Sequence, residues 1–112
     1  MIETIVKDFI DRYSSLDCYC ERPETAPAEY YLVEKTGSST ANQITTSTIA
    51  VQSYAKSLYK AAVLNDEVIE LLKTLPYYSA DVSSVKLNSD SNFTNAAAKQ
   101  YRYQAVFLIT HY

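Results

Sequence analysis

The sequence predicts an α+β protein in which two main helices pack on one face of a mostly antiparallel sheet of about four to five strands. Two stretches repeat apolar residues at steps of three and four, as amphipathic helices do. Other stretches are rich in β-branched and aromatic residues, which is typical of strands. The chain has 112 residues, 47% of them hydrophobic, which suits a single domain over residues 1–112. The order helix, strands, helix, strands favours helices layered on a sheet.

The N-terminal helix is predicted over residues 2–16. Its apolar residues recur along one stripe: Ile2, Ile5, Val6, Phe9, Tyr13 and Leu16. A short extended segment follows at residues 18–22 and ends at Pro23. Cys18 and Cys20 would share one face of this segment. We predict that they are two packed, reduced thiols, with a redox pair as the alternative.

An antiparallel hairpin is predicted at about residues 28–52. Its strands are the aromatic and β-branched stretch 28–35 and the Thr-, Ile- and Val-rich stretch 43–52. Between them, residues 36–42 are polar and contain Gly37, the only glycine of the chain. We interpret this segment as a loop that is longer than a tight turn and has a mobile tip.

The long helix is predicted over residues 53–75. Ser53 is the expected N-cap, Pro76 the expected stop, and Asn65 with Asp66 either a weak point or a junction of two helices. The C-terminal strands are predicted within residues 81–112, at 81–87 and 99–112, with a polar turn or loop at 88–92. Both faces of the last strand are apolar at residues 106–109, which predicts a central place in the sheet.

The composition argues against catalysis and cofactor binding. One glycine nearly excludes Gly-rich phosphate loops, and one histidine, His111, leaves a single candidate imidazole base and no multi-histidine metal site. The carboxylates at helical spacing are interpreted as solvated helix faces. We therefore predict no enzyme activity, no cofactor and no metal.

Charge and hydropathy exclude two further classes of partner. The ten Lys and Arg residues are scattered and the formal net charge is −3, which argues against direct binding of duplex DNA. The longest apolar runs are far shorter than the roughly 20 residues of a membrane helix. The N-terminal residues also lack the apolar stretch of a secretory signal. We expect no membrane association and no secretion.

The eleven tyrosines are the positive signal. Tyrosine is enriched where a surface is partly apolar and partly wet, as at protein interfaces. A chain of this size cannot bury all of them completely. The candidate subunit-interface residues are Tyr77, Tyr78, Phe93, Tyr101, Tyr103 and Tyr112. The alternative is that most rings line the core with the hydroxyl at its rim.

Residues 45–112 resemble a family of small proteins from long-tailed bacteriophages and prophages. The resemblance is carried by residues 51–59 (VQSYAKSLY), 85–95 (VKLNSDSNFTN) and 99–107 (KQYRYQAVF). These relatives are minor capsid or tail-completion proteins that look like tail terminators. The resemblance implies a compact α+β fold and no enzymatic activity.

The same resemblance implies a place in the virion, at the tail or the head-tail junction. The protein would form a ring, usually a hexamer, that caps the tail tube and joins it to the head. Its partners would be copies of itself, a tail-tube protein and a head-completion protein, with DNA only passing through the lumen. Before assembly it would be a free monomer in the host cytoplasm. The alternatives are a head-closure, connector or tail-tube protein, and a non-viral small protein-binding module; an enzyme using carboxylates is disfavoured.

Overall fold

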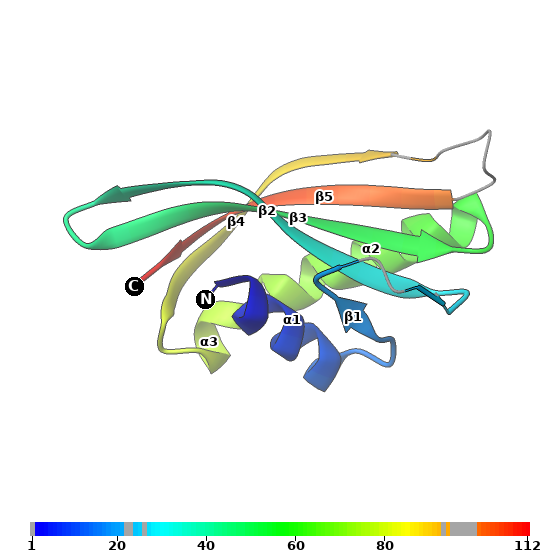
Figure 1. Ribbon diagram of the computed structural model, residues 1–112, viewed down its shortest axis with the longest axis horizontal. Coiled ribbons are helices and arrows are strands. Elements are labelled where there is room, and N and C mark those ends of the chain that lie inside the picture. The colour runs from blue at the N-terminus through cyan, green and yellow to red at the C-terminus, as the bar shows by residue number, and fades with distance from the viewer. Residues whose placement is uncertain (1, 22–23, 26, 93, 95–100) are drawn as a thin grey trace.

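The protein has an α+β fold with a five-stranded sheet and three helices in the part that the structure describes (Figure 1). The computed structural model describes residues 2–21, 24–25, 27–92, 94 and 101–112. The elements are α1 (Ile2–Tyr13), β1 (Cys18–Tyr19), β2 (Tyr30–Ala41), β3 (Ile44–Ala55), α2 (Leu58–Leu72), α3 (Leu75–Tyr78), β4 (Val82–Asn92) and β5 (Tyr101–His111). The sheet order is β1-β2-β3-β5-β4. Among the described strand pairs, only β1 and β2 are parallel, so the prediction of a mostly antiparallel sheet is confirmed.

β5 lies inside the sheet, between β3 and β4. It pairs with β3 without irregularity from Tyr101 opposite Ala55 to His111 opposite Thr45. Its alternate residues Ala105, Phe107 and Ile109 are fully buried. The central place predicted from the two apolar faces of this strand is therefore confirmed.

The predicted loop at residues 36–42 is wrong. β2 runs to Ala41 and β3 begins at Ile44, so only Asn42 and Gln43 form the turn. Their φ angles are 54° and 67°, and a positive φ at both central residues defines a type I′ hairpin turn. Serine and threonine favour loops locally, but here each residue from 37 to 41 pairs with β3. Pairing with a distant strand outweighed local propensity.

The turn offers a direct stability prediction. Gln43 adopts a left-handed conformation that glycine reaches without steric cost. We expect Gln43→Gly to raise the free energy of unfolding by roughly 0.5–1 kcal/mol, since Asn-Gly is the preferred type I′ pair. Urea denaturation would measure the change. Thr40→Gly, in the adjacent strand, is the control and should destabilise; a loss of stability in both variants would contradict the turn assignment.

The N-terminal helix ends at Tyr13, three residues before the predicted end. Leu16 lies beyond the end of the helix and still packs against the core. Its apolar spacing therefore reflects burial and not helical structure. The N–H of Leu16 donates to Ser14 Oγ at 3.2 Å, and the N–H of Cys18 donates to Asp11 Oδ1 at 2.8 Å. These bonds turn the chain from α1 into β1.

The long helix begins later than predicted and contains no break. Ser57, not Ser53, is the N-cap: its Oγ accepts the N–H of Lys60 at 3.2 Å. Ser53 lies buried in β3 instead. α2 continues through Asn65 and ends at Leu72, so the alternative of two helices meeting at Asn65 and Asp66 is wrong.

Pro76 does not end the long helix, which stops at Leu72; it lies inside the short helix α3. It lies in the first turn of α3, where a backbone N–H has no partner within the helix, so proline costs no hydrogen bond there. The polar stretch 88–92, predicted as a turn or loop, is the second half of β4. It pairs with residues 103–106 of β5 through a register shift between Leu87 and Ser89.

The main core cluster joins the helices to alternate residues of the strands. Its buried members are Ile2, Val6, Phe9, Ile10, Cys18, Tyr31, Val33, Ile49, Val51, Ala55, Ala61, Leu64, Val68, Ile69, Leu72, Leu75, Val82, Ala105, Phe107 and Ile109. A second cluster contains Tyr30, Leu32 and Tyr54. Because successive strand residues point to opposite sides, Tyr30 and Tyr31 belong to different faces, and both are buried.

Candidate functional site

The predicted interface residues have three different environments. Tyr77, Tyr78 and Tyr112 are exposed, at 86%, 64% and 72% of their surface. Tyr101 and Tyr103 are half-buried and pack against the main core cluster. Phe93 lies outside the residues that the structure describes. Of the predicted interface residues, those of α3 and Tyr112 are therefore exposed, and Tyr13 of α1 and Tyr59 of α2 are exposed as well.

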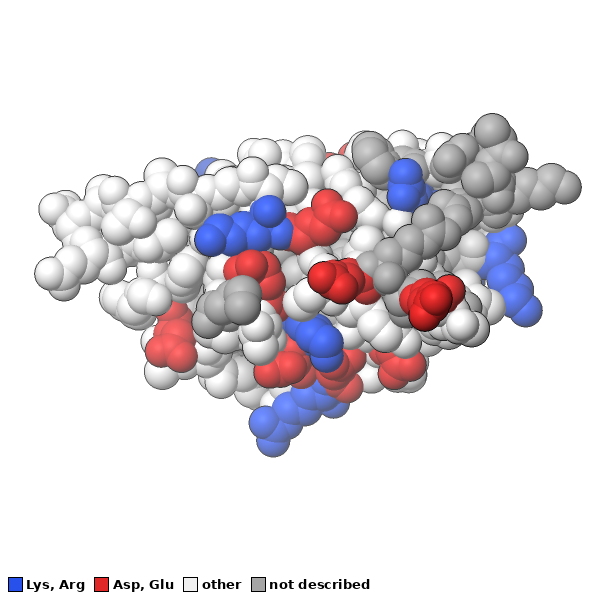
Figure 2. Space-filling view, in the orientation of Figure 1, with Lys and Arg blue, Asp and Glu red and all other residues white. Residues whose placement is uncertain are grey.

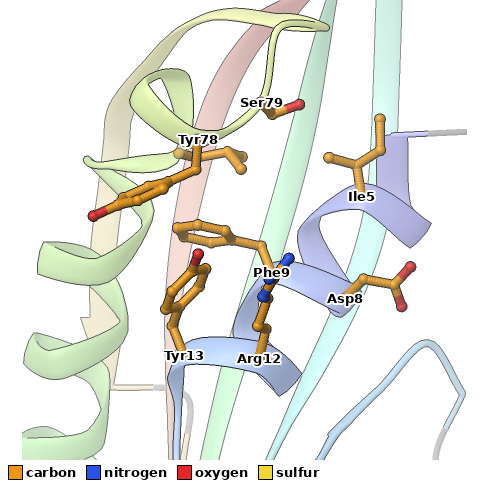
Figure 3. A pocket seen from close by; sticks show the side chains of 8 residues that line it. Ile5, Asp8, Phe9, Arg12, Tyr13, Tyr78 and Ser79 are labelled. Atoms are coloured by element: carbon orange, nitrogen blue, oxygen red, sulfur yellow. The ribbon is translucent and has the colours of Figure 1, made fainter.

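An aromatic patch joins α1 to α3, and we define it as Phe9, Tyr13 and Tyr78 (Figure 3). The ring centroids are 4.9 Å apart for Phe9 and Tyr13, 5.2 Å for Tyr13 and Tyr78, and 5.8 Å for Phe9 and Tyr78. All three pairs are tilted, a geometry worth roughly 0.5–1.5 kcal/mol per pair beyond area burial. Phe9 is buried, whereas Tyr13 and Tyr78 reach the surface.

The aromatic patch forms one wall of a pocket of about 260 Å³. The lining residues are Ile5, Asp8, Phe9, Arg12, Tyr13, Leu75, Tyr78 and Ser79. Arg12 places its guanidinium carbon 5.7 Å from the centroid of the Tyr13 ring, within cation–π range. Aromatic walls with a nearby cation suit an apolar or aromatic side chain of a partner, with a polar group at its rim. Spacing on α1 alone predicts Phe9 and Tyr13 on one face, but not that Tyr78 meets them.

A more polar hollow of about 410 Å³ shares Tyr13 with this pocket. It is lined by Tyr13, Ser14, Ser15, Tyr31, Glu67, Val68 and Leu71. The hydroxyl of Tyr31 donates to the carbonyl oxygen of Leu64 at 3.3 Å. Burial raises the pKa of Tyr31 to about 12, so its hydroxyl is a neutral donor at physiological pH and not a base.

A polar network on the Tyr30 face of the sheet was not predicted from the sequence. The rings of Tyr30 and Tyr54 are stacked with centroids 4.5 Å apart. The Tyr54 hydroxyl donates to Gln52 Oε1 at 2.8 Å, and Gln52 Nε2 donates to Gln104 Oε1 at 3.0 Å. Arg102 donates to the Tyr54 hydroxyl at 2.8 Å. These bonds satisfy the polar atoms between the strands, which assigns the network a structural role.

The two ring nitrogens of His111 lie near a serine hydroxyl and a backbone oxygen. Its Nε2 lies 2.8 Å from the Oγ of Ser47, and Ser47 is fully buried. Its Nδ1 lies 3.4 Å from a backbone oxygen of Tyr112. In the described residues, no group of three or more His, Cys, Asp or Glu side chains could hold a metal ion.

The two cysteines have different environments, so the prediction of two packed thiols holds only for Cys18. Cys18 is buried, and this burial raises the pKa of its thiol to about 12. Cys20 is exposed, and desolvation also raises the pKa of its thiol from the ordinary value. Neither thiol is activated towards nucleophilic chemistry, because the thiolate is the reactive form.

The described residues include no helix that is long and apolar enough to span a bilayer. The aromatic patch, the exposed tyrosines and the outer strands of the sheet are candidate surfaces for contact with a partner. No family model matches the chain, and no curated protein matches it.

Proposed function

We propose that this chain is a structural virion protein of a long-tailed phage or prophage, similar to the tail terminators that form a ring on the tail tube and join it to the head. The observation that carries the proposal is the aromatic patch with its exposed neighbour Tyr77. Tyrosines are frequent anchors of protein interfaces, and this patch surrounds a pocket rather than a catalytic group. The resemblance of residues 45–112 supports the same assignment.

We also infer that α1 and α2 cover the same face of the sheet. Support comes from the main core cluster, to which both helices contribute together with Tyr31, Val51 and Phe107 of the strands. Figure 1 draws both helices below the sheet, in agreement with this inference. The opposite face, with Tyr30 and Tyr54, then has no helix of the described residues on it.

The hairpin of β2 and β3 is the second surface that suits assembly. Residues 36–48 contain no charged side chain, and Figure 2 shows this end of the molecule free of Lys, Arg, Asp and Glu on the visible face. Ser and Thr hydroxyls can make hydrogen bonds to a partner without the desolvation cost of burying a charge. An uncharged surface also does not hold a DNA backbone, which suits a lumen through which DNA passes. The proposed partners are copies of this chain, a tail-tube protein and a head-completion protein.

Electron microscopy of the purified protein mixed with tail tubes tests the proposal. The tubes would be assembled from the tail-tube protein encoded beside this gene. We expect extra density at one end of each tube and no growth beyond it. Tubes that elongate normally and carry no end density in the presence of this protein would contradict a terminator.

Tyr78→Ala is the variant that tests the patch. Loss of its two ring contacts should cost about 1–3 kcal/mol of folding stability. Binding to tube ends should fall by a factor of roughly 30, as expected for an interface anchor worth about 2 kcal/mol. Tyr59→Ala is the matched control, because Tyr59 is 79% exposed and lies on α2, away from the patch. Equal capping by both variants would show that the patch is not an interface.

The alternative assignments predict different behaviour. A tail-tube subunit polymerises into tubes by itself, whereas a head-closure or connector protein binds head-completion proteins without binding tubes. A non-viral binding module would have no tail genes beside it. We favour the terminator over these three alternatives because residues 45–112 resemble tail-completion proteins that look like tail terminators.

A further inference from the structure

The tip of the β2–β3 hairpin exposes one large apolar side chain. Ile44 is the first residue of β3, and 40% of its surface is exposed. In Figure 1 the hairpin extends beyond the helices. Edge strands that stay in solvent usually carry charged side chains, which prevent pairing with other chains. Residues 36–48 carry none, so this hairpin has the composition of a surface that is covered in an assembly.

The pocket at the aromatic patch can take an apolar side chain. Phe9 and Leu75, which are both buried, form part of its lining. Tyr78 and Tyr13 also line it and are exposed, so the pocket opens to the surface (Figure 3). Liquid water takes roughly 30 Å³ per molecule, so a pocket of about 260 Å³ has room for the carbon atoms of an isoleucine side chain. Burial of those carbons against the rings favours binding through the hydrophobic effect.

The lining of the pocket also includes a carboxylate and a guanidinium. Asp8 and Arg12 lie one turn apart on α1, and the ion pairs of the described residues involve neither of them. The hairpin turn presents two side-chain amides, those of Asn42 and Gln43, next to Ile44. An amide has donor N–H groups and an acceptor oxygen, so it can donate to the carboxylate and accept from the guanidinium. The tip and the pocket are therefore complementary in apolar surface and in hydrogen bonding.

The tip cannot reach the pocket of its own chain. Ile44 pairs with Ala41, and from Thr45 onward β3 is held by β5. The turn has only two residues, which keeps the tip in line with the sheet. The pocket lies between α1 and α3, away from this tip (Figure 1). A contact between tip and pocket therefore joins different surfaces of two copies, and contacts of this type form rings when the rotation between copies closes.

We propose that Ile44 at the hairpin tip of each copy fills the pocket of the next, between Tyr13 and Tyr78 of the partner subunit. This proposal rests on the ring assembly proposed above and names the contact that builds the ring. One hairpin tip buries less than the roughly 1,200–2,000 Å² of a stable interface, so two free subunits should bind weakly. A tube end that holds several subunits raises their effective concentration and completes the ring. The sides of the hairpin stay outside this contact and can face the lumen.

Chemical cross-linking tests the contact directly. Ala41→Cys places a thiol beside the tip, and Ser79→Cys places one in the lining of the pocket. Both changes are made in a Cys20→Ser background, with the buried Cys18 retained. A mixture of the two proteins is treated with a short thiol-specific cross-linker at high concentration, with and without tail tubes. We expect linked dimers in the mixture, none from either variant alone, and a ladder of oligomers from a chain with both changes.

Removal of the apolar tip is the second arm. Ile44→Ala should weaken self-association by about tenfold, measured by sedimentation of concentrated protein and by the cross-linking yield. Leu58→Ala is the matched control, because Leu58 is 41% exposed and lies at the start of α2, outside the lining of the pocket. It should leave association unchanged.

Gln43→Gly separates the contact from folding. This variant should fold more stably, because glycine reaches the left-handed conformation of position 43 without steric cost. It also removes an amide from the tip, so it should weaken association by about threefold. A turn with a purely structural role would change stability and association in the same direction, and that result would contradict the contact.

Three further results would overturn the contact: no linked dimer in the mixture, linked dimers from Ala41→Cys alone, or equal association of Ile44→Ala and Leu58→Ala. Tube capping by the unmodified protein separates these results from the function itself. Capping without the cross-link removes the contact and leaves the terminator assignment in place. The cross-link without capping supports the contact and removes the terminator assignment.

Discussion

Phe107→Ala is expected to lower the free energy of unfolding by about 3–5 kcal/mol. Phe107 is fully buried in the inner strand β5, opposite Ile49 of β3 and Leu87 of β4. Its ring connects the strands to the main core cluster, so alanine would leave a cavity that three strands and a helix cannot easily fill. Domains of this kind have a total stability of roughly 5–15 kcal/mol, so the variant should be close to unfolding at physiological temperature.

Urea denaturation followed by circular dichroism would measure this loss. Tyr59→Ala is the control, since its side chain is 79% exposed and its removal should change stability by less than about 0.5 kcal/mol. A loss below about 1 kcal/mol for Phe107→Ala would mean that the sheet does not pack as described. Loss of tube capping would follow from unfolding and would say nothing about the interface.

Asn65→Asp is expected to be nearly as damaging at neutral pH. Asn65 is almost fully buried in α2, and its Nδ2 donates to Asp90 Oδ1 of β4 at 2.6 Å. An aspartate at position 65 would replace this hydrogen bond with two carboxylates in contact. We expect a loss of about 3–5 kcal/mol, as for a buried charge left without its partner.

The effect of Asn65→Asp should depend on pH in a defined direction. The two carboxyl groups would share one proton, which raises the folded-state pKa of one of them above the unfolded value of about 3.9. The folded state then binds more protons than the unfolded state between these two pKa values. The loss of stability is therefore full above the raised pKa and shrinks as the pH falls through it. Urea denaturation at neutral pH and at about pH 5 would show the difference.

The double variant Asn65→Asp/Asp90→Asn is the matched control for this prediction. It exchanges the donor and the acceptor and keeps the hydrogen bond, so it should recover part of the stability; the rest stays lost because the carboxylate now lies at the buried position 65. A double variant as unstable as Asn65→Asp would show that the bond does not determine the effect. Because Asp90 lies on β4, this bond also ties α2 to an outer strand of the sheet.

The apolar patterns of the sequence predicted those features that depend on which side of a single helix or strand is buried. Apolar spacing identified the helices that became α1 and α2, although Ser57 rather than Ser53 caps the second. A helix can begin only after the preceding strand has ended. Ser53 still lies within β3, paired with Tyr31 and Tyr103, so it cannot cap α2. The segments 36–41 and 88–92 are strands and not the predicted loops. Their polar side chains face solvent while their backbones pair with β3 and β5.

The candidate site was predicted only in part. The excess of tyrosine and the adjacent pair Tyr77 and Tyr78 pointed to exposed aromatic surface, and both side chains are exposed. No sequence pattern joined Tyr78 to Phe9 and Tyr13, because α3 and α1 are separated by most of the chain. The half-buried Tyr101 and Tyr103 could not be distinguished from exposed residues, since alternation leaves the choice of inner face to the packing.

By itself, the sequence determined the α+β class, the type and order of the main elements, and the inner position of β5, because these follow from apolar periodicity within each segment. Only the tertiary structure decided that β2 continues as a strand to the Asn42-Gln43 turn, that Asn65 binds Asp90, and that α3 completes the aromatic patch. It also decided that β1 and β4 are the outer strands of the sheet. These features are contacts between residues far apart in the chain. Their backbone hydrogen bonds and packing depend on tertiary context, which local propensities do not describe.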